Sequence, residues 1–252
     1  MSTPLAVQLY SARDRLADDR AGVLRRLAEI GYAAVEPFAP TDDPAGFRRI
    51  ADDLGLAVCA THATGLMRGE DAAEIFDAVH TLGTELVIVP GGIPREEFAT
   101  ADGLARIADR LNGIADQARA RGLRFGYHNH DHELEYIVDG RHALDVLADL
   151  LAPEIFLEID TYWAAVGGAD VPDLLRRHGD RVRLLHVKDG PVVRGEPNVA
   201  VGEGEIPVED YLAAAPDAWR VVEFDTCATD VLDALEASYR YLATLDRSGE
   251  GA

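Results

Sequence analysis

The sequence predicts an α/β protein whose eight strand–helix units close into a single (β/α)8 TIM barrel, one domain spanning residues 1–252. Short apolar runs alternate eight times with longer amphipathic segments, a rhythm typical of parallel βα units. The 252 residues are close to the ~250 of one such barrel. No Gly-x-Gly-x-x-Gly turn follows the first apolar run, so a doubly wound open sheet is the less favoured alternative.

Eight short apolar runs are the strand candidates. They are expected at Leu5–Tyr10, Ala33–Phe38, Ala57–His62, Leu86–Pro90, Arg124–His130, Ile155–Asp160, Val182–Lys188 and Arg220–Asp225. The parallel strands of a barrel all end on the same face, and enzymes of this architecture carry their active sites there. The active site is therefore expected at the C-terminal face.

The segments between the strands carry apolar residues on one face, as helices that cover a sheet do. In Arg20–Ile30, for example, Val23 and Leu27 share a face. The other helices are expected at Pro44–Leu54, Ala72–Leu82, Leu104–Ala120, Ala143–Leu150, Pro172–His178, Val208–Ala215 and Val231–Thr244. The loops 131–140 and 190–207 are longer than the rest, and we expect them to overhang the active face.

The composition bears on partners and location. With 45 acidic and 24 basic side chains the formal net charge is −21, which would repel a nucleic-acid backbone. Neither a basic segment followed by an apolar run nor an apolar stretch of ~18 residues occurs. No leader or membrane span is therefore expected, and the expected location is cytoplasmic. Cys59 and Cys227 are too few for a disulfide framework.

Ionisable residues gather where four consecutive strand candidates end. The pairs, each spaced i, i+2, are His128/His130, Glu158/Asp160, His186/Lys188 and Glu223/Asp225. Side chains two apart on a strand share a face, so both members of each pair can face the barrel opening. Buried histidines and carboxylates need mutual compensation or an ion, because an isolated buried charge costs several kcal/mol. We expect a divalent cation there.

Four motifs mark the ends of the fifth to eighth strand candidates. They are Tyr127-His128-Asn129-His130-Asp131, Glu158-Ile159-Asp160-Thr161, His186-Val187-Lys188-Asp189 and Val222-Glu223-Phe224-Asp225. Supporting motifs are Gln8-Leu9-Tyr10-Ser11, Val35-Glu36-Pro37-Phe38, Thr61-His62 and Gly202-Glu203-Gly204-Glu205-Ile206-Pro207. In this order they resemble the xylose isomerase-like sugar phosphate isomerase/epimerase superfamily over nearly the whole chain.

The resemblance implies one divalent metal ion held by the fifth to eighth strands. Its ligands fall on Asp160, His186 and Glu223, with His128 where many members have a glutamate. This donor set suits Mn²⁺ first, then Co²⁺, Zn²⁺, Mg²⁺ or Fe²⁺, and suits Ca²⁺ less. In isomerase and epimerase members, two glutamates from the fifth and eighth strands move the proton. Here His130 is expected to act as the base beside Glu223, or else to orient neighbouring loops.

Two further charged residues have expected roles at the metal site. Glu158 is expected to hydrogen-bond the metal-bound His186 or a substrate hydroxyl. Lys188 is expected to stabilise a developing oxyanion. A static salt bridge from Lys188 to Glu158 or Asp225 is the alternative.

Three residues are expected to bind substrate. His62 and Glu36 end the third and second strand candidates opposite the metal, and we expect them to contact substrate hydroxyls. Trp163 directly follows the sixth strand candidate and is expected to stack on a sugar ring. For each of them, bracing or packing under a loop is the alternative.

The chemistry that fits these residues is removal of a proton next to a carbonyl, through a metal-stabilised enediolate. The first hypothesis is a sugar or keto-sugar isomerase or epimerase. The second is a dehydratase or 3-keto-glycoside lyase, because an imidazole at the fifth strand can protonate a leaving oxygen. A DNA-lesion phosphodiesterase is disfavoured by the charge, and a non-catalytic sugar-binding module is the last alternative. The expected partner is a sugar, keto-sugar or polyol, with no nucleic acid and no membrane; a homo-oligomer stays open.

Overall fold

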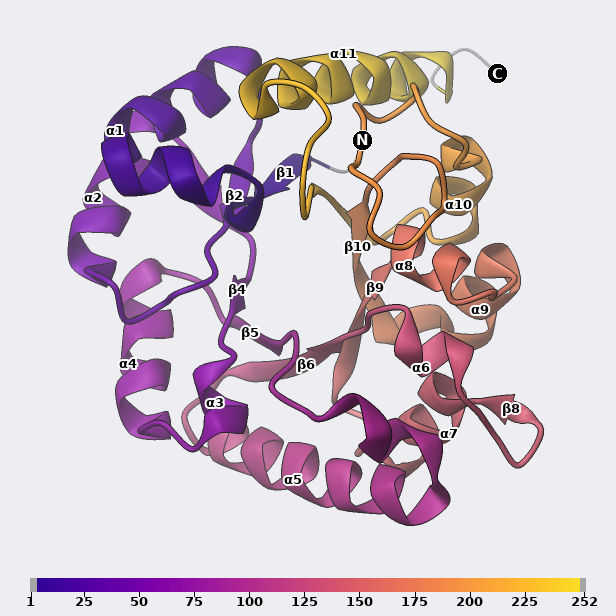
Figure 1. Ribbon diagram of the computed structural model, residues 1–252. Helices are drawn as coiled ribbons and strands as arrows, with labels where there is room; N and C mark the ends of the chain where they lie inside the picture. Colours follow the sequence, from indigo (N-terminus) through magenta and orange to yellow (C-terminus); the bar gives the residue numbers. More distant parts are fainter. Residues whose placement is uncertain (1–3, 250–252) are drawn as a thin grey trace.

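The computed structural model describes residues 4–249, which form a barrel of parallel strands surrounded by helices (Figure 1). The strands are β1 (Leu5–Gln8), β2 (Ala34–Glu36), β3 (Ala57–Val58), β4 (Thr61–His62), β5 (Leu86–Val89), β6 (Arg124–His128), β9 (Phe156–Asp160), β10 (Val182–Val187) and β11 (Trp219–Val222). They follow the order β3-β2-β1-β11-β10-β9-β6-β5-β4. The TIM-barrel fold class predicted from the sequence is confirmed.

The third expected strand, 57–62, is divided in the structure. Its first part, β3, pairs with β2, and its second part, β4, pairs with β5. Between the two parts, the backbone N–H of Cys59 still donates to Val35 O, and just after them that of Ala63 donates to Ile88 O. This one segment therefore changes neighbours along its length and joins the two ends of the sheet.

The helices lie outside the barrel. Helix α1 (Arg13–Ile30) begins earlier than expected and is kinked at Asp19, whose φ and ψ are −149° and 81°. The other long helices match the expected segments closely: α2 (Pro44–Leu54), α4 (Ala72–Leu82), α5 (Ala101–Ala120), α7 (Ala143–Leu150), α9 (Val171–His178), α10 (Val208–Ala214) and α11 (Val231–Gly249). Shorter turns are η1 (Leu9–Ala12), α3 (Gly65–Arg68), η2 (Arg95–Ala99), α6 (His132–Glu135), α8 (Thr161–Val166) and η3 (Gly179–Arg181).

The barrel interior is layered because side chains alternate along each strand. The floor is an apolar cluster that includes Ala6, Ala34, Ala60, Phe156, Leu184 and Val221. Gly126 belongs to this layer, and a Cβ on it would lie 2.3 Å from Phe156 Cε2, so a larger residue would displace the ring. Two residues further along the chain from each of these seven positions, the buried side chain is polar: Gln8, Glu36, His62, His128, Glu158, His186 and Glu223. The apolar layer thus supports a polar one.

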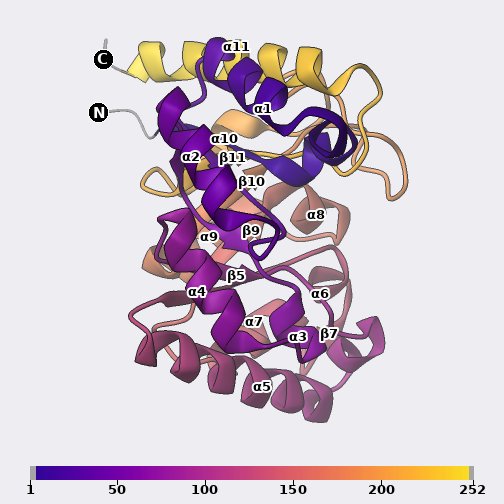
Figure 2. The same ribbon diagram turned by 90° about the vertical axis from the view of Figure 1, so that its left-hand side faces the viewer.

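The two long loops carry structure of their own. The loop after β6 contains α6 and a hairpin of β7 (Ile137–Val138) and β8 (Arg141–His142). In the side view of Figure 2, α6, α8 and β7 all lie at the right-hand edge of the barrel. The loop 190–207 after β10 is held by the buried Asp189 carboxylate. That carboxylate accepts hydrogen bonds from four backbone N–H groups, those of Gly190, Gly202, Gly204 and Ile206.

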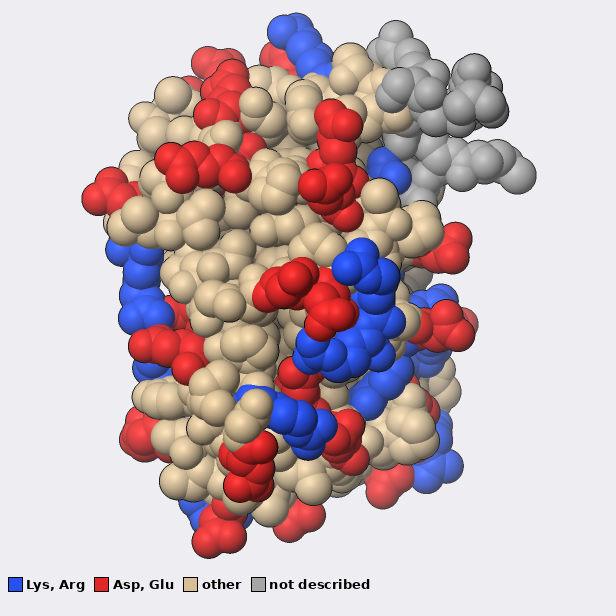
Figure 3. Space-filling model, turned by 90° about the vertical axis from the view of Figure 1, so that its right-hand side faces the viewer, with Lys and Arg blue, Asp and Glu red and all other residues tan. Residues whose placement is uncertain are grey.

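The outer surface carries charges of both signs. On the face shown in Figure 3, basic side chains gather in one group with acidic side chains directly beside them. Ion pairs join neighbouring helices, as where Arg177 of α9 pairs with Asp145 of α7. Among residues 4–249, no helix is both long and apolar enough to cross a membrane.

Candidate active site

The polar layer brings side chains from opposite sides of the barrel into contact. On neighbouring strands the register aligns His128 with Glu158. Across the barrel, His186 Nε2 lies 2.8 Å from Glu36 Oε2, and His62 Nε2 lies 2.6 Å from Glu158 Oε2. Each of these residues is at most 5% exposed. They form a connected network at the barrel axis rather than separate groups on the rim.

His186 is the centre of this network. Its Nδ1 lies 2.8 Å from Glu223 Oε2, and its Nε2 lies 3.2 Å from Glu158 Oε1 in addition to the Glu36 contact. Gln8 Nε2 donates to the same Glu36 oxygen at 2.9 Å. Burial opposes a charge on His186, but the carboxylates of Glu158 and Glu223 outweigh burial and raise its pKa well above the usual value.

Lys188 follows β10, and its ammonium touches three carboxylates. Nζ lies 2.8 Å from Asp160 Oδ2, 2.6 Å from Glu223 Oε2 and 2.7 Å from Asp225 Oδ2. Trp163 Nε1 also donates to Asp225 Oδ2, at 3.1 Å. Burial opposes the charge of Lys188, but the three carboxylates outweigh it and hold its pKa well above the usual value. Lys188 is therefore a fixed cation that compensates the acidic side chains around it.

Four side chains of this network could hold a divalent ion. One ligand atom from each lies within 4.8 Å of the others in the group His128, Asp160, His186 and Glu223. A second, overlapping group consists of His62, His128, Glu158 and His186. His128 Nδ1 lies 3.1 Å from Glu158 Oε2, and Asp160 Oδ2 lies 2.8 Å from Lys188 Nζ. Within residues 4–249 neither buried atom makes a hydrogen bond of acceptable geometry, so both could accept an ion. The donors fit a divalent metal, and the first group offers two carboxylates to offset its charge.

Burial and neighbouring charges separate the carboxyl pKa values. Burial, reinforced by Glu158, raises the pKa of Glu36 to about 7. Burial raises the pKa of Asp160 to about 6, although Lys188 acts in the other direction. Glu158 and Glu223 have pKa values well below the usual range, because nearby cationic groups outweigh burial. A cation beside Asp160 would favour its ionised form.

His130 stands just beyond β6 at the cavity wall. Its backbone N–H donates to Glu133 Oε2 at 3.0 Å, and Tyr127 Oη donates to Glu133 Oε1 at 2.5 Å, so the buried Glu133 anchors this turn. Burial, reinforced by the Lys188 ammonium, lowers the pKa of His130 to about 4. This is below the ~6.5 of a free imidazole. The ring is therefore neutral at pH 7.

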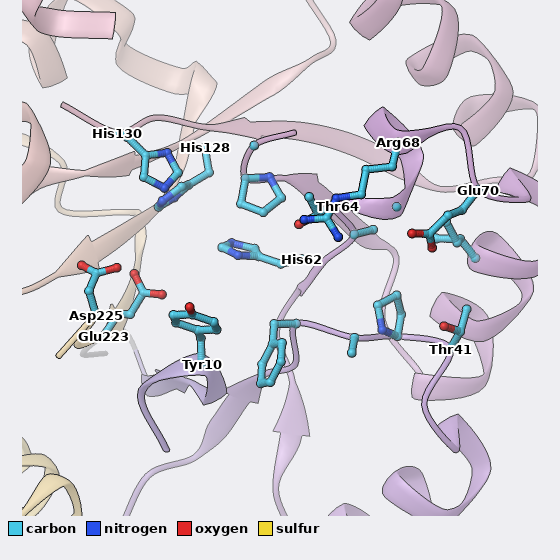
Figure 4. A pocket seen from close by; sticks show the side chains of 18 residues that line it. Tyr10, Thr41, His62, Thr64, Arg68, Glu70, His128, His130, Glu223 and Asp225 are labelled. Carbon is cyan, nitrogen blue, oxygen red and sulfur yellow. The ribbon is translucent and has the colours of Figure 1, made fainter. Parts of the chain in front are cut away.

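A cavity of about 530 Å³ opens above the network (Figure 4). Its inner end is lined by His62, His128, His130, Glu223 and Asp225, and it continues past Tyr10 and Phe38 to Thr41, Thr64, Arg68 and Glu70. Figure 4 shows the carboxylates of Glu223 and Asp225 on one side of the inner end and the imidazoles of His128 and His130 across from them. The cavity thus joins the candidate metal site to the loops after β2 and β4.

Comparison with known protein families identifies the family of this chain. The sequence profile of the family described as "Xylose isomerase-like TIM barrel" matches residues 24–223. The chain belongs to this family. The resemblance predicted from the strand-end motifs is confirmed.

Two curated proteins are distant relatives of this xylose isomerase-like chain. An inosose dehydratase of Geobacillus kaustophilus is 27% identical over 190 residues, which cover 66% of this chain and 61% of that protein. A 3-dehydroshikimate dehydratase of Pseudomonas aeruginosa is 25% identical over 191 residues, covering 68% of this chain and 28% of that protein. The match therefore spans about three-fifths of the first relative and less than a third of the second.

Solved structures share the fold over almost the whole chain. A sugar phosphate isomerase/epimerase from Parabacteroides distasonis has a TM-score of 0.82 at 21% identity, covering 96% of this chain and 94% of that one. An L-ribulose 3-epimerase has a TM-score of 0.69 at 19% identity, covering 99% of this chain and 97% of that one. At these identities the likeness shows the fold alone.

The structure brings the four expected metal ligands together, but it places two expected substrate-binding residues elsewhere. Glu36 is not opposite the metal group: it is fully buried and contacts His186. Trp163 is not among the residues that line the cavity, and its indole is bound to Asp225. His62 does line the cavity. Glu36 contacts His186 because polar side chains one layer above the floor meet at the barrel axis, whereas Trp163 lies in α8, outside the strands.

Glu158 and Lys188, the two further charged residues with expected roles, also lie below the cavity and not in its wall. Glu158 contacts His186, one of its two expected partners, and is not among the residues that line the cavity. Lys188 pairs with Asp225 rather than with Glu158.

Several residues of the site escaped the sequence reasoning. Gln8 and Phe38 lie in motif segments, yet nothing in their pattern showed that Gln8 would bind Glu36 or that Phe38 would line the cavity. Arg68 carried no signal, because a single arginine in a loop resembles any solvated residue. Only the fold places Arg68, the last residue of α3, beside the cavity.

Proposed function

We propose that this chain is a metal-dependent carbon–oxygen lyase that removes a proton next to the carbonyl of a keto-sugar or keto-polyol and expels a β-oxygen. The observation that carries the proposal is the inner end of the cavity. Its carboxylates, Glu223 and Asp225, both follow β11, and they face the imidazoles of His128 and His130. This reverses the order of the two hypotheses that the sequence favoured.

We assign one divalent ion, with Mn²⁺ the first candidate, to His128, Asp160, His186 and Glu223. When bound, such an ion polarises a carbonyl and makes the neighbouring C–H more acidic. Glu36 and Glu158 contact the Nε2 of His186 and so orient its ring. Lys188 neutralises the carboxylates around it and keeps them in one arrangement.

His130 is assigned to move the proton. Its pKa is lowered to about 4, so the ring is neutral at pH 7 and can accept a proton from carbon, as a weaker base than a free imidazole. The protonated ring is then a strong enough acid to give that proton to the departing β-oxygen. The C–H and C–O bonds break, a C=C bond forms, and the proton leaves with water or an alcohol. These proton transfers do not need a second carboxylate.

The two curated relatives described above support this choice, since each is named a dehydratase and a dehydratase expels water. Their substrates are not carried over, because this chain spans only part of each.

Isomerisation or epimerisation of a sugar is the second candidate. Glu223 and His130 approach the inner end from different sides. One of them would then remove a proton and the other would return a proton to the opposite face or to the adjacent carbon.

Incubation of the metal-loaded protein with ketoses, keto-polyols and 3-keto-glycosides in D₂O separates the candidates. An unsaturated or cleaved product supports the lyase. An isomeric sugar that carries deuterium on carbon supports the isomerase or epimerase. If neither product forms in protein that contains about one metal ion per chain, both proposals are overturned.

The proposed partner is a small sugar, keto-sugar or polyol. We do not propose action on nucleic acid, because the net charge of −21 opposes binding of a phosphate backbone. We retain the predictions that the protein is cytoplasmic and that it could form a homo-oligomer.

A further inference from the structure

The cavity is longer than one sugar ring requires. Its volume is about 530 Å³. A hexose of about twelve heavy atoms fills roughly 200 Å³ at the packing density of protein interiors. A single ring that reaches the metal group therefore leaves more than half of the cavity unfilled.

The remainder of the cavity, which we call the distal arm, is lined by Phe38, Thr41, Thr64, Arg68 and Glu70. Figure 4 shows Thr41, Thr64, Arg68 and Glu70 at the end away from His130 and Asp225, with the Arg68 side chain extending toward Thr64. Across residues 4–249, the side chains of Arg68 and Glu70 make no hydrogen bond or ion pair with another residue. Both charged groups are therefore available to a ligand.

The chemistry of the distal arm matches a neutral, hydroxyl-rich ring. Arg68 supplies donors, Glu70 supplies acceptors, and the two threonine hydroxyls do both. Phe38 and Tyr10 form an aromatic wall, with ring centroids 5.4 Å apart in an edge-to-face arrangement. The formal charges of Arg68 and Glu70 cancel, so the arm has no excess of positive charge for a phosphate or carboxylate.

We propose that the distal arm binds a second, uncharged glycosyl unit, so that the substrate is a two-ring glycoside. The first ring lies over the metal group, and the second lies against Phe38 between Arg68 and Glu70. This inference rests on the proposed function and deepens it, because the second ring is the alcohol that a lyase would release. Water leaving from a single-ring substrate would leave the arm unused.

The test measures binding without turnover. Unoxidised sugars lack the keto group and cannot react, so titration calorimetry on the metal-loaded protein can compare glucose, glucose 6-phosphate, and the disaccharides cellobiose, maltose and sucrose. We expect at least one disaccharide to bind about tenfold more tightly than glucose, the effect of one charge-assisted hydrogen bond. Glucose 6-phosphate should gain nothing over glucose.

Substitutions in the distal arm test whether Arg68 and Glu70 cause the tighter binding of the disaccharide. Arg68→Ala and Glu70→Gln should each weaken disaccharide binding about tenfold and leave glucose binding unchanged. The matched controls are Arg49→Ala and Glu74→Gln, which change exposed residues of α2 and α4 that do not line the cavity. Both controls should bind disaccharide as the unchanged protein does.

Three results would overturn the inference: no disaccharide binding, equal binding of glucose and every disaccharide, or tighter binding of glucose 6-phosphate that is lost in Arg68→Ala. The last result would make the arm an anion site. Disaccharide selectivity without turnover on any keto-sugar would contradict the proposed function alone. Turnover of single-ring keto-sugars without disaccharide selectivity would contradict this inference alone.

Discussion

The inner end and the distal arm of one cavity are built on opposite electrostatic principles. Beneath the inner end, buried charges compensate one another: Lys188 touches three carboxylates, and His186 has a carboxylate at each ring nitrogen. In the arm, Arg68 and Glu70 are exposed, and no described residue pairs with either side chain. The buried charges are held in place by one another, whereas Arg68 and Glu70 have no partner among the described residues.

This contrast separates chemistry from selectivity. Removing one member of a buried charge network leaves its partner uncompensated, which is strongly destabilising. Removing an exposed, unpaired side chain costs the fold little, because water already solvates it. Changes at the inner end should therefore affect metal binding, stability and turnover together, and changes in the arm should affect ligand choice alone.

The largest expected effect is that of Glu223→Gln. The substitution removes a charged metal ligand that also contacts His186 and Lys188. Turnover should fall by at least about 10³-fold, equivalent to about 4 kcal/mol. The measurement is turnover together with metal content per chain, with circular dichroism as the check on folding. Glu203→Gln, in the exposed part of the loop after β10, is the control. Full metal content with unchanged turnover would remove Glu223 from the site.

Lys188→Met should give the next largest effect. The three carboxylates around it would lose their shared ammonium, and the loss of one partner from a buried charge network costs about 3 kcal/mol or more. Urea unfolding of the metal-free protein measures this cost. Arg15→Met, which breaks an exposed ion pair with Asp230, is the control and should cost less than about 1 kcal/mol. Equal costs for the two variants would show that the buried Lys188 network stabilises the fold no more than an exposed ion pair does.

Removal of the metal should lower stability by a comparable amount. Binding at a concentration of about 100 Kd stabilises a folded protein by about 2.7 kcal/mol. For a chain of this size that corresponds to a fall in Tm of roughly 5–11 °C on chelation. Thermal unfolding with EDTA and with restored Mn²⁺ measures it. Asp160→Asn should show a much smaller difference between the two conditions, and a difference as large as in the unchanged protein would exclude Asp160 as a ligand.

The smallest expected effect is in the arm. Phe38→Ala removes part of the aromatic wall, which should weaken sugar binding by about fivefold, close to 1 kcal/mol. Metal affinity should not change, because Phe38 contacts none of the proposed ligands. Calorimetric titrations with sugar and with Mn²⁺ measure the two effects separately. A parallel loss of both affinities would show that the two ends of the cavity are coupled.

The sequence by itself determined the order of the elements and the face that carries the site. Alternation along a strand is local, so the i, i+2 spacing of Glu158/Asp160 and Glu223/Asp225 predicted that these side chains share a face. Apolar periodicity, which is also local, predicted most helix ends within a few residues, but it missed the start of α1 at Arg13 and the end of α11 at Gly249. The metal-ligand group was predicted from strand alternation, element order and the family motifs, and the structure brings its members together.

Tertiary structure alone decided the contacts that cross the barrel. Glu36 and His186 are 150 residues apart in the chain, and their 2.8 Å contact depends on closure of the sheet through 57–62. The lowered pKa of His130 depends on burial and on Lys188, which follows another strand, β10. Desolvation and charge–charge energies are functions of distance in space, and distance along a chain does not specify them until strand register and barrel radius are set.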